Sequence, residues 1–540
     1  MPTDRDQLWS TDAVAAAILD GQTLIVYRDK LLRIPDKWLT AHPGGNLALL
    51  HLVGRDATDE IEAYHSDETL ALVPRYSVGR VQNTLDKPWV PFVPPLMSGW
   101  VRRPDSQGKQ SWFREAQDQR SQVNTEDSPS SQIMVLPTDA QSLSEKGPTI
   151  ATITAPPSNL SLTQQAQHSK AYRELHQRVT DADLYKTPYI TGYGPEVARY
   201  ILFACVSVYA YSNQWFKTSA LFLGFLWHQL VFTAHDLGHM GVTHDWALDR
   251  LIAIGIADFI GGLSIGWWVN NHNVHHIVTN HPSHDPDIQH IPFFAISTQF
   301  FSSLWSSYYK KTMALDGPAK YLISIQHKLF YIVMSLARFN LYSNSYLYLY
   351  QKAFDTQRAR GGKWAFRLEV LGIVVFWTWY SRVLYNTGSW QNALIYLLIS
   401  NVTPSPLHVQ IVLSHFSMST ADLGPTESFP HRQLRTTTDV ICPDSIGFIH
   451  GGLQLQVTHH LFPRLPRHNL RKASVLVKQY CQEQGLDYAE FGFIDGNMDV
   501  IGVLRNVAEQ VKIVGKVANA EVHEAVEKSA IALEKQGNSG

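Results

Sequence analysis

The stretches that decide the fold are His235-Asp-Leu-Gly-His239, His272-Asn-Val-His275-His276 and Gln456-Val-Thr-His459-His460. Residues three or four positions apart lie on one face of a helix, so each stretch can present its imidazole rings together. Imidazole suits first-row metals such as iron. One buried histidine is usually a hydrogen-bonded core residue, but three clusters in this order indicate a metal centre. The candidate site residues are therefore His235, His239, His272, His275, His276, Gln456, His459 and His460.

Each cluster lies just beyond an apolar stretch long enough to enter a membrane. About four transmembrane helices are predicted, over residues 197–216, 218–234, 366–385 and 393–413. A further apolar run, residues 251–268, contains four glycines and lies between the first two clusters. Because all three clusters must meet on one side of the membrane, this run is predicted to be re-entrant or interfacial.

The distribution of basic residues predicts the orientation in the membrane. The loop of residues 386–392 has no lysine or arginine, whereas Lys310, Lys311 and Lys472 are among the basic residues on the histidine side. By the positive-inside rule, the metal site and both termini face the cytosol. The N-terminal residues do not form a signal sequence, so internal spans are expected to direct insertion.

Composition excludes several classes of protein. The formal net charge is −2 and the basic residues are scattered, so no nucleic-acid partner is expected. Cys205, Cys442 and Cys481 are far apart and form no CxxC motif, which argues against a disulfide framework or a zinc knuckle. Apolar residues make up 45% of the chain, so soluble parts are expected beside the spans.

Changes in composition divide the chain into four parts. Residues 8–83 are predicted to form a small α+β domain with a strand at 23–27. Residues 84–167 are rich in Pro, Ser and Gln and are predicted to be a flexible linker, although its early part, Trp89–Trp100, has enough aromatic surface to pack on a folded part. Residues 168–499 are predicted to form an all-α integral membrane domain. Residues 500–540 are expected to be an amphipathic helix or a disordered tail.

The first domain carries a second pair of candidate metal ligands. His42-Pro-Gly-Gly45 places an imidazole beside a turn whose glycines allow close approach of a flat ligand, and His65 follows. Trp38-Leu39 precedes the turn and Gly54-Arg-Asp-Ala-Thr58 lies between the histidines. On these residues the domain resembles cytochrome b5. The resemblance implies one haem b held by His42 and His65 and used for electron transfer.

Acidic residues surround the second of these histidines. They are Asp59, Glu60, Glu62, Asp67 and Glu68. They are interpreted either as a solvated helix face or, from the resemblance, as a docking surface for a basic reductase.

Both parts together resemble the front-end membrane desaturases with a fused cytochrome b5 domain. Within that group, four stretches are most similar to the fungal sphingolipid Δ8 desaturases: residues 267–276, Asp285-Pro-Asp287, residues 428–439 and residues 459–467. One residue departs from the pattern, because the group usually has Glu where this chain has Thr458.

The resemblance implies the chemistry. It implies two non-haem irons, O2 as co-substrate, and a Δ8, trans double bond placed in the sphingoid base of ceramide or glucosylceramide. Electrons would come from NADH through a separate cytochrome b5 reductase, in the endoplasmic reticulum membrane. Enzymes of this kind have a further histidine ligand before the third cluster, and His415 matches it better than His408.

Other residues near the clusters are interpreted as supporting or wall residues rather than as metal ligands. His281, His284 and His290 are expected to be polar loop residues or to hydrogen-bond the ligands, and Asp236 is expected to support His235. Four aromatic residues are interpreted as walls of a substrate tunnel or as an interfacial aromatic belt. They are Trp227, Phe232, Trp267 and Trp268.

Three other functions stay open at this point. A cytochrome b5-fused lipid hydroxylase could share the iron site, although Gln456 favours the front-end desaturases. A Δ6-type acyl-lipid desaturase is the nearest relative in chemistry. A non-catalytic haem electron carrier with a membrane anchor would leave the three histidine clusters unexplained.

Overall fold

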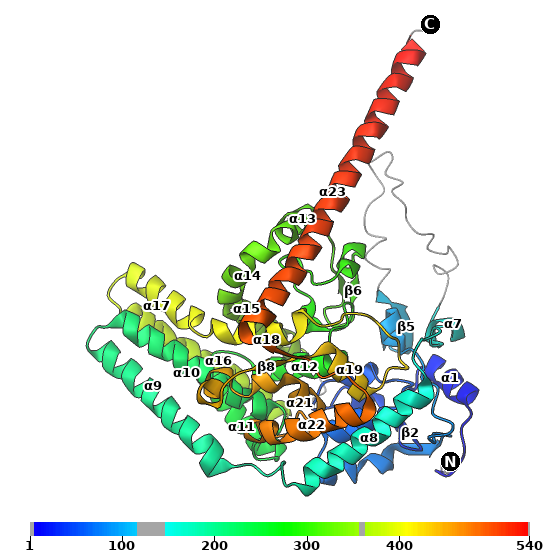
Figure 1. Cartoon of the computed structure of the whole chain (residues 1–540), viewed down its shortest axis with the longest axis horizontal. Coiled ribbons are helices and arrows are strands. Elements are labelled where there is room, and N and C mark those ends of the chain that lie inside the picture. The colour runs from blue at the N-terminus through cyan, green and yellow to red at the C-terminus, as the bar shows by residue number, and fades with distance from the viewer. Residues whose placement is uncertain (1–4, 116–145, 356–361, 538–540) are drawn as a thin grey trace.

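The structure, a computed structural model, describes residues 5–115, 146–355 and 362–537. The centre of the predicted linker, residues 116–145, therefore lies outside the described residues. The chain forms an N-terminal unit with a small sheet and a larger helical unit packed beside it (Figure 1). The elements of the N-terminal unit are α1 Thr11–Leu19, β1 Thr23–Tyr27, β2 Lys30–Ile34, α2 Asp36–Leu39, α3 Asn46–Leu50, α4 Thr58–Tyr64, α5 Asp67–Leu70 and β3 Ser77–Arg80.

The N-terminal unit has the α+β architecture that the sequence predicts. Its antiparallel sheet has the order β1-β2-β3, and the strand predicted at residues 23–27 is confirmed as β1. Every residue of β1 is buried, because helices cover one face of the sheet and the other packs on α1. The sheet supports α3 and α4, which flank the two candidate haem ligands.

Ordered structure extends into both ends of the predicted linker. The packing of its early aromatic residues agrees with the sequence, but less of the stretch can be flexible than predicted. The elements are β4 Trp100–Pro104, β5 Gln110–Arg114 and α7 Ile150–Ile153. All pack on the N-terminal unit because aromatic and apolar side chains anchor them. Trp89 donates its indole N–H to the Gly54 carbonyl over 2.9 Å, and Trp112 donates to the Leu19 carbonyl over 2.9 Å. Ile153 is fully buried in the core of the same unit.

The segment that joins the two units is consequently short. Val93 donates its backbone N–H to the Ile153 carbonyl oxygen over 2.8 Å. The chain is therefore held on the N-terminal unit up to Ile153. Helix α8 begins at Leu162 with Ser161 as its N-cap. Residues 155–161 therefore make the connection.

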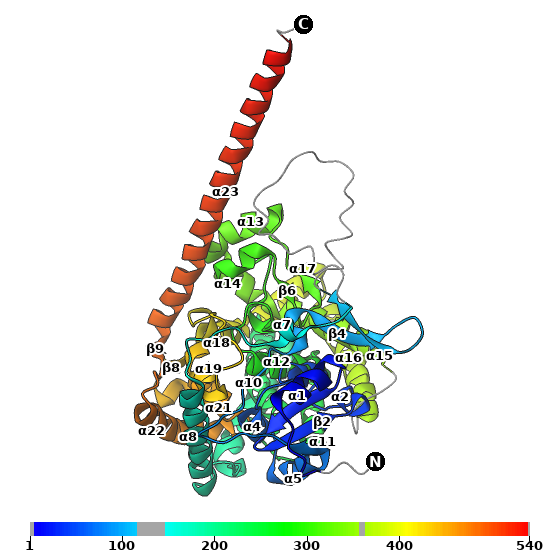
Figure 2. The same cartoon turned by 90° about the vertical axis from the view of Figure 1, so that its right-hand side faces the viewer.

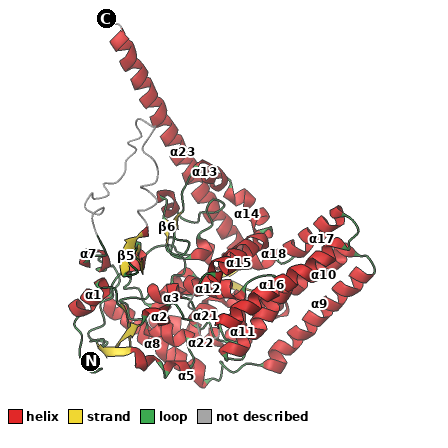
Figure 3. Ribbon diagram, turned by 180° about the vertical axis from the view of Figure 1, so that it is seen from behind, coloured by secondary structure: helices red, strands yellow, loops and turns green. Residues whose placement is uncertain are grey.

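The second unit is helical, as predicted, with two short two-stranded sheets in addition (Figure 3). Its first elements are α8 Leu162–Asp181, α9 Gly194–Ser212, α10 Phe216–Gly238, α11 Trp246–Ile254, α12 Ile265–Ile277, β6 Trp305–Ser306, β7 Lys311–Thr312, α13 Gly317–Ser324, α14 Gln326–Ser335 and α15 Ala337–Ala353. The later ones are α16 Gly362–Tyr385, α17 Trp390–Val402, α18 Ser405–Phe416, α19 Phe429–Thr436, β8 Asp439–Ile441, α20 Gly447–His450, α21 Gln456–Leu461, α22 Leu470–Gln484, β9 Glu490–Gly492 and α23 Phe493–Gly537.

The predicted spans fall on helices that lie side by side. Helices α9, α10 and α17 form one extended layer, and α16 packs against α17 (Figure 1). The fourth predicted span is wrong as a continuous helix, because Pro404 lacks the N–H that would join α17 to α18. By length and apolar character, none of the described helices qualifies alone as a membrane crossing; only Trp246–Ile260 together with Ile265–Ile277, bent by 113°, does.

This bend fixes the start of α12, the helix that carries the second cluster. The Ser264 hydroxyl accepts a hydrogen bond from the Trp267 backbone N–H over 3.0 Å and donates one to Glu369 over 2.6 Å. Glu369, on α16, also accepts from the Gly266 backbone over 3.1 Å. A carboxylate at a helix N-terminus is favourable because the unpaired N–H groups there are partly positive. Helix α16 thus sets the position of α12.

The long C-terminal helix α23 begins within the helical unit and extends away from it, as two views show (Figures 1 and 2). Its first turns pack on α13, α14 and α18 through Val500, Leu504 and Val507. Residues 500–537 are thus helical, which was one of the two expectations for this tail.

Candidate active site

The histidine clusters, far apart in the sequence, meet at the centre of the helical unit. Four of the residues form one group in which one ring nitrogen of each residue lies within 4.8 Å of those of the others. Helix α10 supplies His235 and ends at His239, α12 supplies His272, and α21 supplies His459.

A second group of three lies beside the first. The ligating atoms of His275, His415 and His460 also lie within 4.8 Å of one another. Gln456 is next to this group, with its amide nitrogen 3.4 Å from His415 Nε2. His408, the weaker candidate in the sequence, belongs to neither group. It lies two helical turns before His415, against the apolar cavity described below.

His276 lies between the two groups. Its Nε2 is 3.0 Å from His272 Nε2, and its ring stacks on that of His460 with 4.1 Å between the ring centres. The eight candidate residues and His415 are thus all in one place.

Several buried imidazole nitrogens in this place have no hydrogen-bond partner among the described residues. They are Nε2 of His235, His239, His459 and His460. A buried polar atom without a partner costs about 1–3 kcal/mol. Bonds to metal ions would satisfy these atoms, and neutral imidazole is a suitable donor for iron. The donor set therefore fits a histidine-bound iron centre.

Oxygen atoms around the groups hold the rings in place. Asp285 binds His275 Nδ1 at 2.9 Å and accepts the Asn280 backbone N–H at 2.7 Å. Gln433 on α19 accepts from His460 Nδ1 over 2.9 Å and donates to the His276 carbonyl over 2.8 Å. Such contacts orient a ligand and fix which ring nitrogen is free for metal.

The acidic residue beside His235 has a network of its own. Asp236 lies 3.5 Å from His235 Nδ1, as the sequence suggested. It also accepts hydrogen bonds from Arg467 and from the Tyr193 hydroxyl, both over 2.6 Å. Sequence reasoning did not identify Arg467, Tyr193 or Gln433 as part of the site.

The three additional histidines of the loop after α12 lie outside both groups, as expected. His281 pairs with Asp422 at 3.3 Å, and His284 bonds to the Ser307 hydroxyl at 2.9 Å. His290 lines the cavity described next.

An apolar cavity of about 220 Å³ ends at the histidine groups. His235, His272, His275 and Gln456 lie at one part of its wall. Apolar and aromatic side chains form most of the rest, including Leu230, Ile411 and the predicted tunnel residues Trp227, Trp267 and Trp268. Phe232, the fourth aromatic candidate, is not in this wall; it packs with Leu407 and Leu453.

The two candidate haem ligands of the N-terminal unit, His42 and His65, face each other. Their ring centres are 6.2 Å apart. A metal lies about 2 Å from each imidazole nitrogen that binds it, so one iron fits between the rings. His42 Nδ1 bonds to the Gly45 carbonyl at 3.0 Å and His65 Nδ1 to the Ile61 carbonyl at 2.8 Å, which leaves both Nε2 atoms for iron.

The protonation of this pair suits metal binding. Burial, together with the neighbouring His65, lowers the pKa of His42 to about 4. Burial also lowers the pKa of His65. Both imidazoles are therefore neutral near pH 7, as ligands to haem iron must be. The pair fits two axial haem ligands.

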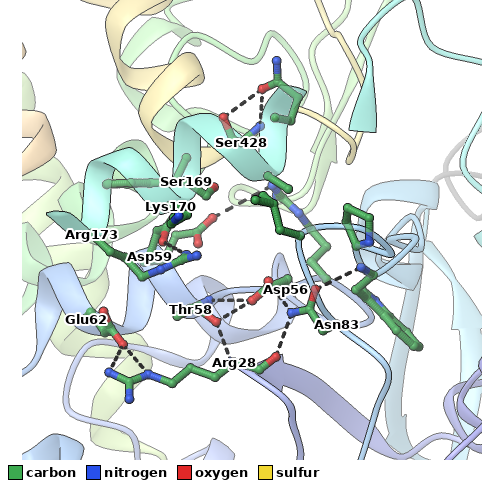
Figure 4. Close-up of a pocket in the computed structure, with 18 of the residues that line it drawn as sticks. Arg28, Asp56, Thr58, Asp59, Glu62, Asn83, Ser169, Lys170, Arg173 and Ser428 are labelled. Carbon is green, nitrogen blue, oxygen red and sulfur yellow. Dashed lines mark hydrogen bonds and ion pairs between the residues drawn. The ribbon is translucent and has the colours of Figure 1, made fainter. Parts of the chain in front are cut away.

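The acidic residues near His65 do not form a solvated face. Asp59, Glu60 and Glu62 are buried, and only Asp67 and Glu68 are exposed. Arg173 of α8 binds Asp59 at 2.7 Å, and both residues line a cavity of about 850 Å³ between the two units (Figure 4). Burial raises the pKa of Asp59 to about 7, although Arg173 opposes this shift. In this structure the acidic surface docks on the chain's own helical unit.

These sites define a class of protein: a histidine-rich iron enzyme fused to a haem electron carrier. Residues 213–492 match the family described as "Fatty acid desaturase", and residues 11–82 match "Cytochrome b5-like Heme/Steroid binding domain". The chain belongs to the fatty acid desaturase family, with a fused cytochrome b5 domain.

Relatives match over nearly the whole chain. A "Delta 8-(E)-sphingolipid desaturase" of Emericella nidulans is 43% identical, covering 94% of this chain and 96% of the relative. A protein of the same description from Komagataella phaffii is 42% identical, covering 93% and 94%. The "Delta(8)-fatty-acid desaturase 2" of Arabidopsis thaliana is 31% identical over 91% of each chain. The enzyme is thus an oxidoreductase of the desaturase type.

The haem pair gives a first prediction. In the full chain, His65→Ala should convert a low-spin haem spectrum into a high-spin one or abolish haem binding, because one axial ligand is lost. Absorption spectroscopy of the purified protein measures this. The control is His51→Gln, at the only other histidine of this unit between residues 8 and 83, which can still bond to Ser307. An unchanged spectrum in His65→Ala would show that another ligand serves.

The second histidine group gives another prediction. His415→Ala should abolish desaturated product, because a member of the group is removed, whereas His408→Ala should retain a substantial part of it. Lipid mass spectrometry of cells that express each variant measures the product, and the haem spectrum serves as a folding control. Equal losses in both variants, or an active His415→Ala, would contradict the grouping.

Proposed function

We propose that this desaturase introduces a Δ8, trans double bond into the sphingoid base of ceramide or glucosylceramide. The observation that carries the proposal is the apolar cavity that ends on both histidine groups. It suits a long alkyl chain, and relatives similar over more than 90% of this chain bear the corresponding description.

The proposed ligands follow from the two groups. One iron would be held by His235, His239, His272 and His459, and the other by His275, His415 and His460. His276 would lie between them, and Gln456 would border the second iron and the substrate. Two irons bound there would supply, with O2, the oxidant that removes hydrogen from an unactivated methylene.

The chain's own residues provide placement and exclusion of water. The aromatic wall of the cavity orients the alkyl chain, because an apolar tunnel favours an extended chain in one register. Asp285 and Gln433 keep His275 and His460 in one orientation, with the metal-binding nitrogens directed inward. Burial of the whole group keeps water from the reacting carbons.

We propose that His42 and His65 bind one haem b, which receives electrons from NADH through a separate cytochrome b5 reductase. Because Asp59, Glu60 and Glu62 are buried and Asp59 pairs with Arg173 of the helical unit, a basic reductase cannot bind them in the docked arrangement. The haem unit would therefore leave α8 to be reduced and dock again to deliver the electron. Residues 155–161 span at most about 25 Å when extended, so the movement is short.

We further propose that the enzyme lies in the endoplasmic reticulum membrane. Helices α9, α10, α16 and the pair α17–α18 would embed in it, as the predicted spans do. The haem unit and the histidine groups would face the cytosol, where NADH and the reductase are found.

Lipid analysis tests the substrate and the product. The chain should be expressed in a fungal strain that lacks its own Δ8 sphingolipid desaturase, with His272→Ala as an inactive control. Mass spectrometry with double-bond localisation should show a trans Δ8 sphingoid base only with the active chain. New Δ6 acyl chains or hydroxylated lipids with an unchanged sphingoid base would favour the acyl-lipid desaturase or the hydroxylase instead.

The ion pair between the units tests the docking. Arg173→Glu should weaken the docked state by roughly 1 kcal/mol or more, a factor of about five, because it places like charges together. Product formation with NADH and reductase should fall accordingly, while reduction of the haem by the reductase should not slow.

The matched control is Arg178→Glu on the same helix, which loses an exposed pair with Glu483. It should leave both rates nearly unchanged. Unaltered product formation in Arg173→Glu, or an equal loss in the control, would show that this contact does not support electron delivery.

A further inference from the structure

The docking surface joins residues next to the candidate haem ligands to residues next to the candidate iron ligands. Arg464, which follows the third cluster, donates to the His65 carbonyl oxygen over 2.7 Å. Asn273, within the second cluster, donates to the Gly44 carbonyl oxygen over 3.1 Å. These two hydrogen bonds fix the haem unit against α12 and against the loop that follows α21.

An aromatic contact lies between these hydrogen bonds. Tyr64, the last residue of α4, precedes His65 directly. Its ring meets the ring of His276 edge to face, with 6.1 Å between centres and an angle of 85°. His276 in turn contacts both histidine groups through His272 and His460. Tyr64 thus contacts an iron-centre histidine from the haem side.

Packing holds this ring in place. Tyr64 contacts two apolar clusters, one centred on the haem unit and one on α8, α21 and α22. Its hydroxyl oxygen is shielded from solvent and has no hydrogen-bond partner among the described residues. A hydroxyl in such a place does not stabilise the fold, because a buried polar atom without a hydrogen-bond partner is unfavourable. The ring, rather than the hydroxyl, makes the contact.

We propose that Tyr64 is the residue that couples the two redox sites, so that electrons pass from the haem to the iron centre through His65, Tyr64 and His276. In each step the haem iron goes from ferrous to ferric and one iron of the centre goes from ferric to ferrous. No bond forms or breaks and no proton moves. Two such steps supply the two electrons of one desaturation. This inference rests on the proposed function for the presence of both metal sites.

A rapid-mixing experiment on the full chain tests the coupling separately from product formation. The haem is reduced anaerobically, with the iron centre left ferric, and its reoxidation is followed by absorbance. Tyr64→Leu should slow this transfer at least tenfold, because an aromatic ring is replaced by a saturated side chain. Tyr64→Phe should stay within about threefold of the parent protein, because it keeps the ring.

Controls separate coupling from structure. Haem spectrum, haem potential and iron content should be unchanged in Tyr64→Leu, and hydrogen–deuterium exchange of residues 58–64 should show that the units still dock. Tyr76→Leu, which removes a ring that packs on Trp38 of the same unit, should leave the transfer rate unchanged. Tyr64→Met provides a second non-aromatic variant.

The possible results are distinct. Transfer at the parent rate in Tyr64→Leu and Tyr64→Met would overturn the inference, as would an equal loss in Tyr64→Phe. If the parent protein itself holds no iron centre, or transfers no electron to it, the proposed function fails instead.

Discussion

Buried imidazole nitrogens that lack hydrogen-bond partners are the constraint on which the rest of this structure depends. Four helices bring seven histidines into two groups, and His276 lies between them. In water these rings would be hydrated; here several of their Nε2 atoms are buried without a hydrogen-bond partner among the described residues. Metal ions turn that unfavourable arrangement into a stable one. The fold is therefore built so that α10, α12, α18 and α21 converge on a single point.

Helix α12 links this centre to its surroundings. Glu369 and Ser264 fix its first turn from the side of α16. His272, His275 and His276 on its last turns reach both groups, and Asn273 binds the haem unit. Substrate cavity, iron-binding groups and electron donor therefore share one rigid element. A shift of α12 would change all three together. The contacts of α16 with α12 therefore hold the cavity, the iron-binding groups and the electron donor in register.

Much of the site was accessible from the sequence because its signals are local. The spacing of the clusters identified histidines that the structure brings together, and resemblance to a family selected His415, which lies in the second group, over His408. Gln433, Arg467 and Glu369 could not be found in this way, since their roles arise from contacts between segments more than a hundred residues apart.

Composition was misleading where tertiary contacts override it. The acidic residues of α4 have the pattern of a solvated face, yet they are buried, and Arg173 on α8 pairs with Asp59. The Pro- and Ser-rich stretch reads as one flexible linker, yet Trp89, Trp112 and Ile153 hold its ends on the haem unit. In both cases the deciding partner is distant in sequence.

Counting metal tests the central claim most directly. Total iron and haem should be measured on the same purified full chain after removal of loosely bound metal. The account predicts three irons per chain, of which one is in haem and two are bound by the histidine groups. One iron per chain, all of it in haem, would contradict the account and would indicate a non-catalytic haem electron carrier.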